Sequence, residues 1–174
     1  MALEKPEKDW WKPLTKDERI WIAVALIWML VSFFYMPYYH IAGSQNPPDE
    51  TYRVSPEEFS SLVDAMVEKY KVGEEQGVPI VRPDPSEPVY LKASMWEWYP
   101  ILELEKGKTY RIHLSSVDIQ HGFSLLPLNL NLMVLPDYDY VMEITPMESG
   151  EYHIVCNEYC GLGHHLMVGK LYVR

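Results

Sequence analysis

The sequence predicts a mainly β protein, an antiparallel sandwich or barrel, with one N-terminal membrane helix. An uncharged, largely apolar stretch between residues 20 and 48 predicts the helix. Short runs rich in Val, Ile, Tyr and Leu after residue 88, separated by Gly, Pro, Asn and Asp, predict the strands. The 174 residues leave room for one compact domain besides the helix.

The membrane helix is predicted over residues 20–42. Residues 20–36 are apolar on every helical face, and residues 37–41 extend the run to about 22 residues, enough to cross about 30 Å of hydrocarbon. A cleaved signal peptide is the alternative. Five acidic residues beside five basic ones ahead of the run, and no clear A-x-A site after it, favour a retained anchor. Aromatic side chains suited to the two membrane interfaces flank the run: Trp10, Trp11, Trp21, Tyr35, Tyr38 and Tyr39.

The basic side chains predict the orientation of this helix. Five precede it, and only Arg53 follows within about twenty residues. Because cytoplasmic flanks of membrane helices are rich in Lys and Arg, we expect residues 1–19 in the cytoplasm. The helix would cross the cell inner membrane once, in contact with lipid, and the C-terminal domain would be periplasmic. That exported part, residues 44–174, carries ten basic and twenty acidic residues.

Residues 43–87 are predicted to be a linker that contains one amphipathic helix, at about 56–71. Ser55 can cap this helix, Pro56 suits its first turn, and Glu58 completes a capping box. The apolar side chains that follow recur at helical spacing, so we expect the helix to pack against a core rather than carry chemistry.

Residues 88–174 are predicted to form the β domain. Strand-like composition alternates there with turn residues, as in sandwiches and barrels. The expected strands are 89–98, 101–105, 109–115, 122–126, 131–135, 138–144, 150–155 and 168–173.

The composition excludes two other classes of protein. The chain has 15 Lys and Arg against 25 Asp and Glu, a formal net charge of −10. This charge argues against nucleic acid as a partner, because basic side chains on phosphates supply most of that affinity. Two cysteines, Cys156 and Cys160, are too few for a disulfide-rich scaffold.

Cys156, Cys160, His164 and Met167 fall within twelve residues, and this cluster indicates a metal site. A disulfide suits an exported domain, but it would leave the His and the Met unexplained. Zinc accepts Cys and His but binds Met poorly, and the C-x-x-C-H pattern for covalent haem is absent. Copper is favoured, because thiolate, thioether and imidazole all suit it. Two thiolates could bridge two copper ions.

A second imidazole is needed, and His121, beside Gly122, is the best candidate. His113 and His153 lie inside predicted strands, where alternation favours exposed side chains. His165, next to His164, stays a real alternative, because spacing alone does not choose between the two.

The run 156–167, with His121-Gly-Phe upstream, resembles subunit II of the haem–copper cytochrome c oxidases. It matches the family pattern C-x-x-x-C-x-x-x-H-x-x-M at every ligand position, which selects His164 over His165. The resemblance implies a cupredoxin-like β-barrel with a dinuclear copper centre, Cu-A. The implied ligands are Cys156 and Cys160 as bridges, His121 and His164 on one copper each, and Met167 and the backbone carbonyl of Glu158 as weak ligands.

The resemblance also implies a function. The subunit would accept electrons from a c-type cytochrome and pass them to haems in subunit I, where oxygen is reduced to water with proton pumping. Haem would belong to that partner only, and the oxygen-reducing site would lie outside this chain. Trp96, and after it Trp98, resemble the family's electron-entry residues. A membrane-tethered copper chaperone and a structural subunit of a quinol oxidase are the alternatives.

The segments that flank the membrane helix resemble the B-type, or ba-type, members of the family, which have one helix in subunit II. Glu18-Arg-Ile-Trp21 and His40-Ile-Ala-Gly43 match that subgroup in type and spacing. The resemblance implies that Glu18 lies near the entry of a proton path into subunit I. A carboxylate that simply favours a helix start is the alternative.

Overall fold

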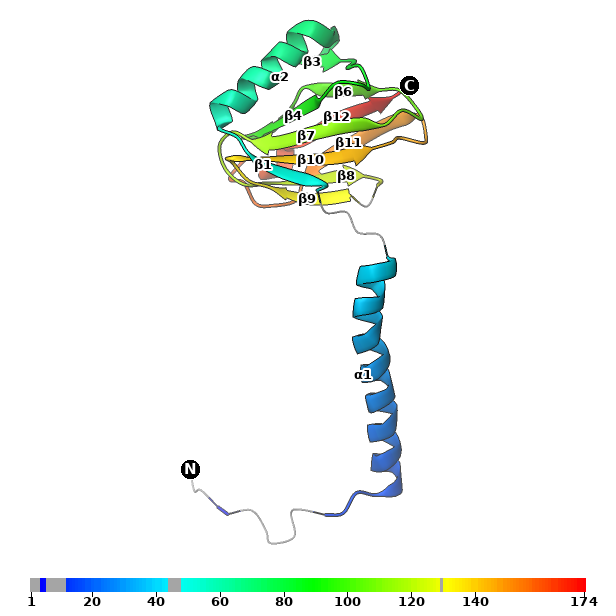
Figure 1. Ribbon diagram of the computed structural model, residues 1–174. Helices are drawn as coiled ribbons and strands as arrows, with labels where there is room; N and C mark the ends of the chain where they lie inside the picture. The colour runs from blue at the N-terminus through cyan, green and yellow to red at the C-terminus, as the bar shows by residue number, and fades with distance from the viewer. Residues whose placement is uncertain (1–3, 6–11, 44–47, 129) are drawn as a thin grey trace. The chain divides into compact units, whose positions relative to one another are not determined.

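The computed structural model describes residues 4–5, 12–43, 48–128 and 130–174. The chain forms two compact units, Met1–Gln45 and Asn46–Arg174. Helix α1 belongs to the first unit, and the strands and helix α2 belong to the second (Figure 1). Trp10 and Trp11, expected at a membrane interface, lie outside the described residues, as do residues 44–47 of the expected linker.

Helix α1, Lys16–Ala42, is long and apolar enough to cross a membrane. Its best 18-residue window has a mean hydropathy of 2.1, and none of its residues is buried in the structure. The helix begins before the predicted residue 20 because a capping box stabilises its start. The Glu18 N–H donates to Thr15 Oγ1 at 3.3 Å, and the Thr15 N–H donates to Glu18 Oε2 at 2.7 Å.

The second unit is a sandwich of two β-sheets, which confirms the mainly β prediction. The five-stranded sheet has the order β1 (Glu50–Arg53), β10 (Tyr138–Ile144), β7 (Tyr110–Ser116), β4 (Val89–Ser94) and β5 (Glu97–Tyr99). The seven-stranded sheet has the order β2 (Lys71–Glu75), β3 (Val78–Val81), β6 (Ile101–Leu104), β12 (Val168–Val173), β11 (Gly150–Cys156), β8 (His121–Leu126) and β9 (Leu130–Val134).

The core lies between the two sheets, because alternate side chains of each strand face inward. On β4, Val89, Leu91 and Ala93 are buried, and the residues between them are partly exposed. Most neighbouring strands run antiparallel, but β4–β7, β3–β6 and β6–β12 are parallel pairs. The largest fully buried apolar side chains are Tyr110, Phe59, Phe123, Leu91, Leu102, Leu104, Ile112, Leu114, Leu125, Ile154 and Met167.

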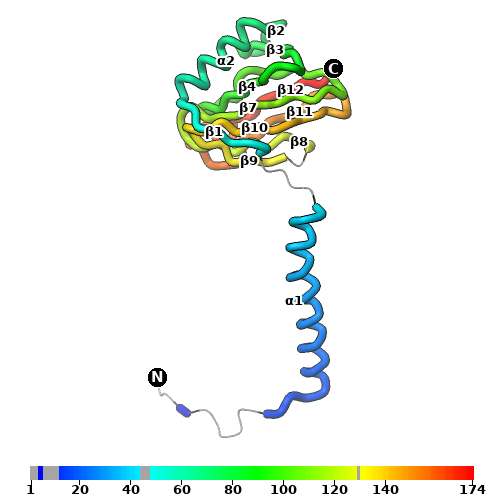
Figure 2. Tube along the Cα trace, in the orientation of Figure 1, coloured from blue at the N-terminus to red at the C-terminus, as the bar shows by residue number. Residues whose placement is uncertain are grey.

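Helix α2, Pro56–Tyr70, lies where the capping pattern predicts it. The Glu58 N–H donates to Ser55 Oγ at 3.1 Å, and Phe59, Val63 and Met66 are buried. This apolar stripe packs mainly against β4 and β3. Figure 2 shows the chain running from α2 through β2 and β3 toward β4, so the helix is part of the β domain.

The segment expected to be a linker, residues 43–87, contributes three strands to the sheets. Strand β1 pairs with β10, and the β2–β3 hairpin joins β6. These strands escape prediction because they are short, and β1 and β2 expose most of their side chains. The expected strand 89–98 is likewise two strands, β4 and β5, joined by a turn at Met95 and Trp96.

Candidate metal centre

Neighbouring strands of the seven-stranded sheet bring the predicted metal ligands together. His121 opens β8, Cys156 closes β11, and the register pairs Cys156 with Phe123. After β11 the chain forms a loop and a short 3-10 helix, His164–Leu166, before β12. This stretch, residues 157–167, is termed the ligand loop below. It returns to the sheet where the Cys156 N–H donates to the Met167 carbonyl at 3.1 Å.

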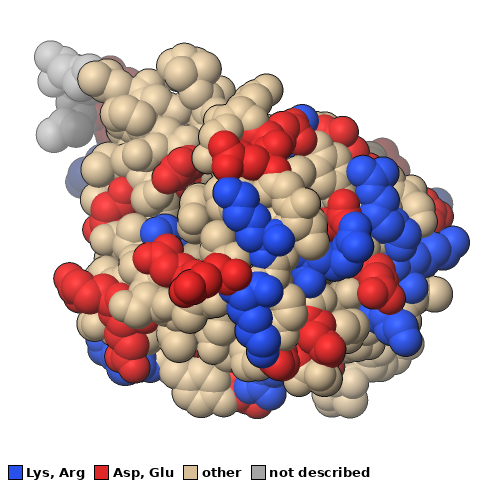
Figure 3. All heavy atoms as spheres, turned by 90° about the horizontal axis from the view of Figure 1, so that it is seen from above, with Lys and Arg blue, Asp and Glu red and all other residues tan. Residues whose placement is uncertain are grey.

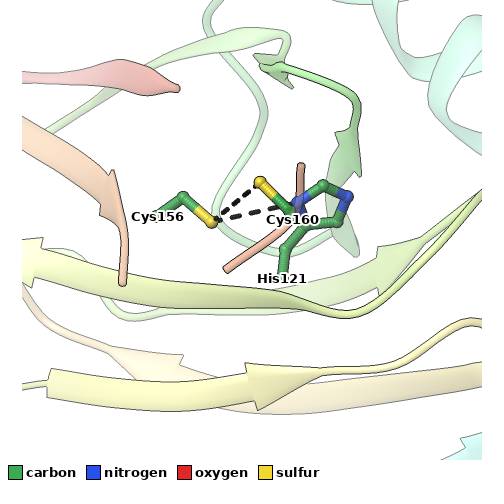
Figure 4. Close-up of side chains that lie close together, drawn as sticks. All are labelled: His121, Cys156 and Cys160. Atoms are coloured by element: carbon green, nitrogen blue, oxygen red, sulfur yellow. Dashed lines mark hydrogen bonds between the residues drawn. The ribbon is translucent and has the colours of Figure 1, made fainter. Parts of the chain in front are cut away.

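The two cysteines lie side by side as free thiols. Their sulfur atoms are 3.6 Å apart, well beyond the roughly 2.05 Å of a disulfide bond. His121 Nδ1 lies 3.9 Å from Cys156 Sγ, and Figure 4 shows its ring turned toward the sulfurs. Cys160 and His121 are fully buried and Cys156 is nearly so, which keeps these three donor groups out of water.

The remaining predicted donors surround the same sulfurs. His164 Nδ1 and Met167 Sδ lie 3.6 Å and 3.8 Å from Cys160 Sγ. The backbone carbonyl oxygen of Glu158 lies 3.2 Å from Cys156 Sγ. The neighbouring His165 has an exposed side chain, whereas His164 faces Cys160.

Asp118 orients the His121 ring. Its Oδ1 lies 2.8 Å from His121 Nε2, so Nδ1 is left facing the cysteines. Burial acts to raise the pKa of Asp118, but hydrogen bonds from His121, Ile119 and Met95 outweigh it and lower that pKa. Sequence reasoning missed this role. The spacing Asp-x-x-His just before a strand was the available signal.

The metal-free site holds the Cys160 thiol in its protonated form. Burial, followed by the neighbouring Cys156 thiol, raises the pKa of Cys160 to about 11. A metal that binds Cys160 must therefore displace a proton from its sulfur.

Gly122 allows the ligand loop to approach β8. A Cβ at this position would lie 2.1 Å from Asn157 Oδ1 and 2.7 Å from the Glu158 backbone nitrogen. Any side chain at residue 122 would therefore push away the segment that carries the Glu158 carbonyl. Gly122 therefore lets the segment that carries Glu158 approach the strand that carries His121.

The other histidines lie apart from the sulfurs. His153 is exposed, as expected for its strand position. The expectation that His113 is exposed is wrong: its side chain is only 12% exposed, and its Nδ1 lies 2.7 Å from Asp139 Oδ2. Strand alternation could not reveal this pair, because Asp139 belongs to a different strand, β10.

The candidate entry and proton-path residues have distinct surroundings. Trp96 is 41% exposed, and its Nε1–H donates to the Cys160 carbonyl at 2.9 Å. Trp98 is only 3% exposed, and its ring centroid lies 6.4 Å from that of His121. Glu18 takes part in the capping box of α1, which is the structural alternative for that residue.

The donor set fits copper. Three side chains in the described ranges lie close enough together to hold a metal ion: His121, Cys156 and Cys160. Their ligand atoms are within 4.8 Å of one another. Two thiols, imidazoles and a thioether are soft or intermediate donors, which copper prefers to the harder oxygen ligands of magnesium or calcium.

Comparison with known sequences identifies relatives that match up to about half of the chain. No family model matches the chain. Two proteins of Thermus thermophilus, both cytochrome c oxidase subunit 2, are 37% identical over 87 residues, or 49% of this chain. The match spans only 64% and 52% of their lengths. A probable cytochrome c oxidase subunit 2 of Streptomyces coelicolor is 38% identical over 69 residues, which are 40% of this chain and 22% of that protein.

Comparison with solved structures extends the likeness over most of the chain. One chain of a heme-copper terminal oxidase dimer matches with a TM-score of 0.58 and 27% identity, over 91% of this chain and 100% of that one. Rusticyanin from Thiobacillus ferrooxidans, a copper protein, matches with a TM-score of 0.52 and 15% identity, over 74% of this chain and 99% of its own. The second match concerns the fold alone and confirms the cupredoxin-like architecture.

Proposed function

Because this chain is a relative of cytochrome c oxidase subunit 2, we propose that it is the electron-transfer subunit of such an oxidase. It accepts electrons from a c-type cytochrome and passes them to the haems of subunit I. Oxygen reduction and proton pumping belong to that partner. The observation that carries the proposal is the arrangement of four further donors around two buried cysteine sulfurs.

The centre that we propose is dinuclear. Cys156 and Cys160 are the shared ligands, because each sulfur has its own imidazole nearby: His121 for the first and His164 for the second. Met167 lies on the Cys160 side, and the Glu158 carbonyl on the Cys156 side. Copper held there would take up and release one electron at a time. The chain's own part is to keep these donors buried and oriented, which lowers the reorganisation that accompanies each transfer.

The electron donor would dock on exposed apolar side chains around the ligand loop. Trp96 is the first candidate for electron entry, because its exposed ring hydrogen-bonds to the carbonyl of a ligand residue. Trp98 is also a candidate, because its ring packs near His121. It ranks second because it is buried. The exposed apolar side chains of this docking surface are Met95, Trp96, Ile119, Tyr159, Leu162 and Leu166.

The side of the β domain that carries α2 has side chains of both charges. Figure 3 views the molecule from above Figure 1, the side of α2, and shows basic and acidic side chains interspersed there. Several form ion pairs, such as Lys69–Glu87 and Lys71–Glu74. This face therefore has no field of one sign to attract a partner. The net charge of −10 acts at longer range and would favour a basic cytochrome.

The anchor would be α1, with residues 1–19 in the cytoplasm, a single pass through the inner membrane, and the β domain in the periplasm. The helix length and the excess of basic residues ahead of it support this orientation. Glu18 would stand near the entry of a proton path. The Glu18 carboxylate also caps α1, and a glutamine can keep this cap but cannot carry a proton. Glu18→Gln should therefore slow proton uptake by the assembled oxidase without loss of assembly. Unchanged turnover would leave Glu18 with capping alone.

Electron delivery is the direct test of this function. When the copper-loaded chain is mixed with a reduced c-type cytochrome in a stopped-flow instrument, the cytochrome should be oxidised at a rate that falls with ionic strength. Trp96→Ala should slow the reaction when the rate is expressed per bound copper. If copper is passed instead to a metal-free acceptor and no electron moves, the alternative of a copper chaperone is correct.

A further inference from the structure

Two tryptophans reach the metal-ligand segments from the opposite sheet. All the predicted ligands belong to the seven-stranded sheet and its loops, whereas Trp98 lies on β5 of the five-stranded sheet and Trp96 directly precedes it. We propose that both are positioning residues, which hold the ligand segments in their metal-binding arrangement before any metal arrives. This inference rests on the proposed function only for the identity of the metal.

Trp96 holds the first part of the ligand loop. Its Nε1–H donates to the Cys160 carbonyl at 2.9 Å, which fixes the backbone of a ligand residue. The indole also lies against two glycines. A Cβ on Gly163 would lie 2.2 Å from Trp96 Cδ2, and one on Gly161 would lie 3.6 Å from Trp96 Nε1. The ring thus occupies the space that any side chain at residue 163 would need.

Trp98 holds the other side of the site through packing. It is 3% exposed, and its ring makes edge contacts with the rings of His121 and Phe123, at centroid distances of 6.4 Å and 5.7 Å. On β12, a Cβ on Gly169 would lie 2.6 Å from Trp98 Cβ. Gly169 is two residues after Met167, so one indole contacts the first imidazole and the strand that follows the thioether. The buried Trp98 Nε1 has no hydrogen-bond partner, which leaves packing as its contribution.

The two indoles are themselves fixed in place. Strand β5 pairs with β4, where Ala93 faces Trp98 and Ser94 faces Glu97. In the turn before β5, the Met95 N–H donates to Asp118 Oδ2 at 2.6 Å. Asp118 therefore joins the turn that carries Trp96 to the imidazole of His121. A site held by such outside contacts loses little conformational entropy when the metal binds, since the ordering has already occurred on folding.

Hydrogen exchange of the metal-free full chain in detergent tests this inference without any metal. Peptides that cover residues 157–167 should exchange slowly in the wild type. Trp96→Phe keeps a ring but removes the indole N–H, and should raise the exchange rate of these peptides about fivefold, as expected for one lost hydrogen bond. Gly163→Ala should raise it by at least as much, because the new methyl displaces the indole. Leu162→Ala, in the same loop but 86% exposed, is the matched control.

The proposal is overturned if Trp96→Phe and Gly163→Ala exchange at wild-type rates, or if the wild-type loop exchanges as fast as an unfolded peptide. Trp98→Phe is preferred to Trp98→Ala because it keeps an aromatic ring in the core. This substitution should speed hydrogen exchange of the peptides around residues 119–123. In copper-loaded protein, the same three substitutions should speed copper release to a chelator. Because the exchange experiment needs no copper, its result stands even if the proposed copper centre is wrong.

Discussion

Substitution of Asp118 by asparagine should weaken the site without changing its shape. The carboxylate accepts hydrogen bonds from His121 Nε2 at 2.8 Å and from the Ile119 and Met95 N–H groups at 2.6 Å each. Both oxygens are used, Oδ1 by His121 and Ile119 and Oδ2 by Met95. Asparagine offers only one acceptor oxygen, so its amide N–H₂ must face at least one of these donors.

The size of the effect follows from these contacts. Hydrogen bonds to a charged group contribute about 1.5 to 3 kcal/mol each, and the Asp118 side chain is only 22% exposed. We therefore expect Asp118→Asn to lower the free energy of unfolding by about 2 kcal/mol. Loss of a group that orients a metal-bound histidine typically lowers metal affinity by about 10- to 100-fold, and we expect a loss in that range.

Two measurements check this prediction. Urea unfolding of the metal-free protein gives the stability change, and competition with a copper chelator gives the affinity change. Glu97→Gln, which removes the same charge from an exposed position on β5, is the control and should change neither quantity. Wild-type copper affinity in Asp118→Asn would refute the argument that Asp118 orients His121.

Three further substitutions test separate parts of the account. His164→Ala should abolish stoichiometric copper binding, whereas His165→Ala should leave it intact; the reverse result in metal analysis would overturn the choice between these neighbours. Phe59→Ala on α2 removes a fully buried ring and should lower the free energy of unfolding by about 3 to 5 kcal/mol. An unchanged free energy of unfolding would show that α2 is dispensable to the domain. Ser55→Ala should cost about 1 kcal/mol in the same assay, whereas Ser55→Gly should cost only a few tenths.

The parts of the structure that could be predicted are those encoded locally. The ligand loop places two thiols, an imidazole and a thioether within twelve residues, so their types and spacing restrict the chemistry before any tertiary contact is known. Helix α1 is predictable because a long uncharged apolar run has few other stable states in a cell. Helix α2 is marked by Ser55, Pro56 and its apolar stripe.

The parts that could not be predicted depend on contacts between distant segments. Strands β1 and β2 are short and mostly exposed, and only pairing with β10 and β3 makes them strands. The contact of Trp96 with Gly163 joins residues far apart in sequence, and neither residue alone indicates it. The buried pair of His113 and Asp139 likewise requires the register of neighbouring strands, because an isolated strand pattern gives a polar residue no reason to be buried.

Copper content combined with electron paramagnetic resonance tests the central claim most directly. The full chain, loaded with copper and freed of excess ion, should hold two copper ions for each chain, as the proposed pair of Cys156 and Cys160 bridges requires. Its resonance spectrum should be that of one unpaired electron shared equally by two copper nuclei. A single copper per chain, or a spectrum split by one copper nucleus alone, would contradict the dinuclear centre.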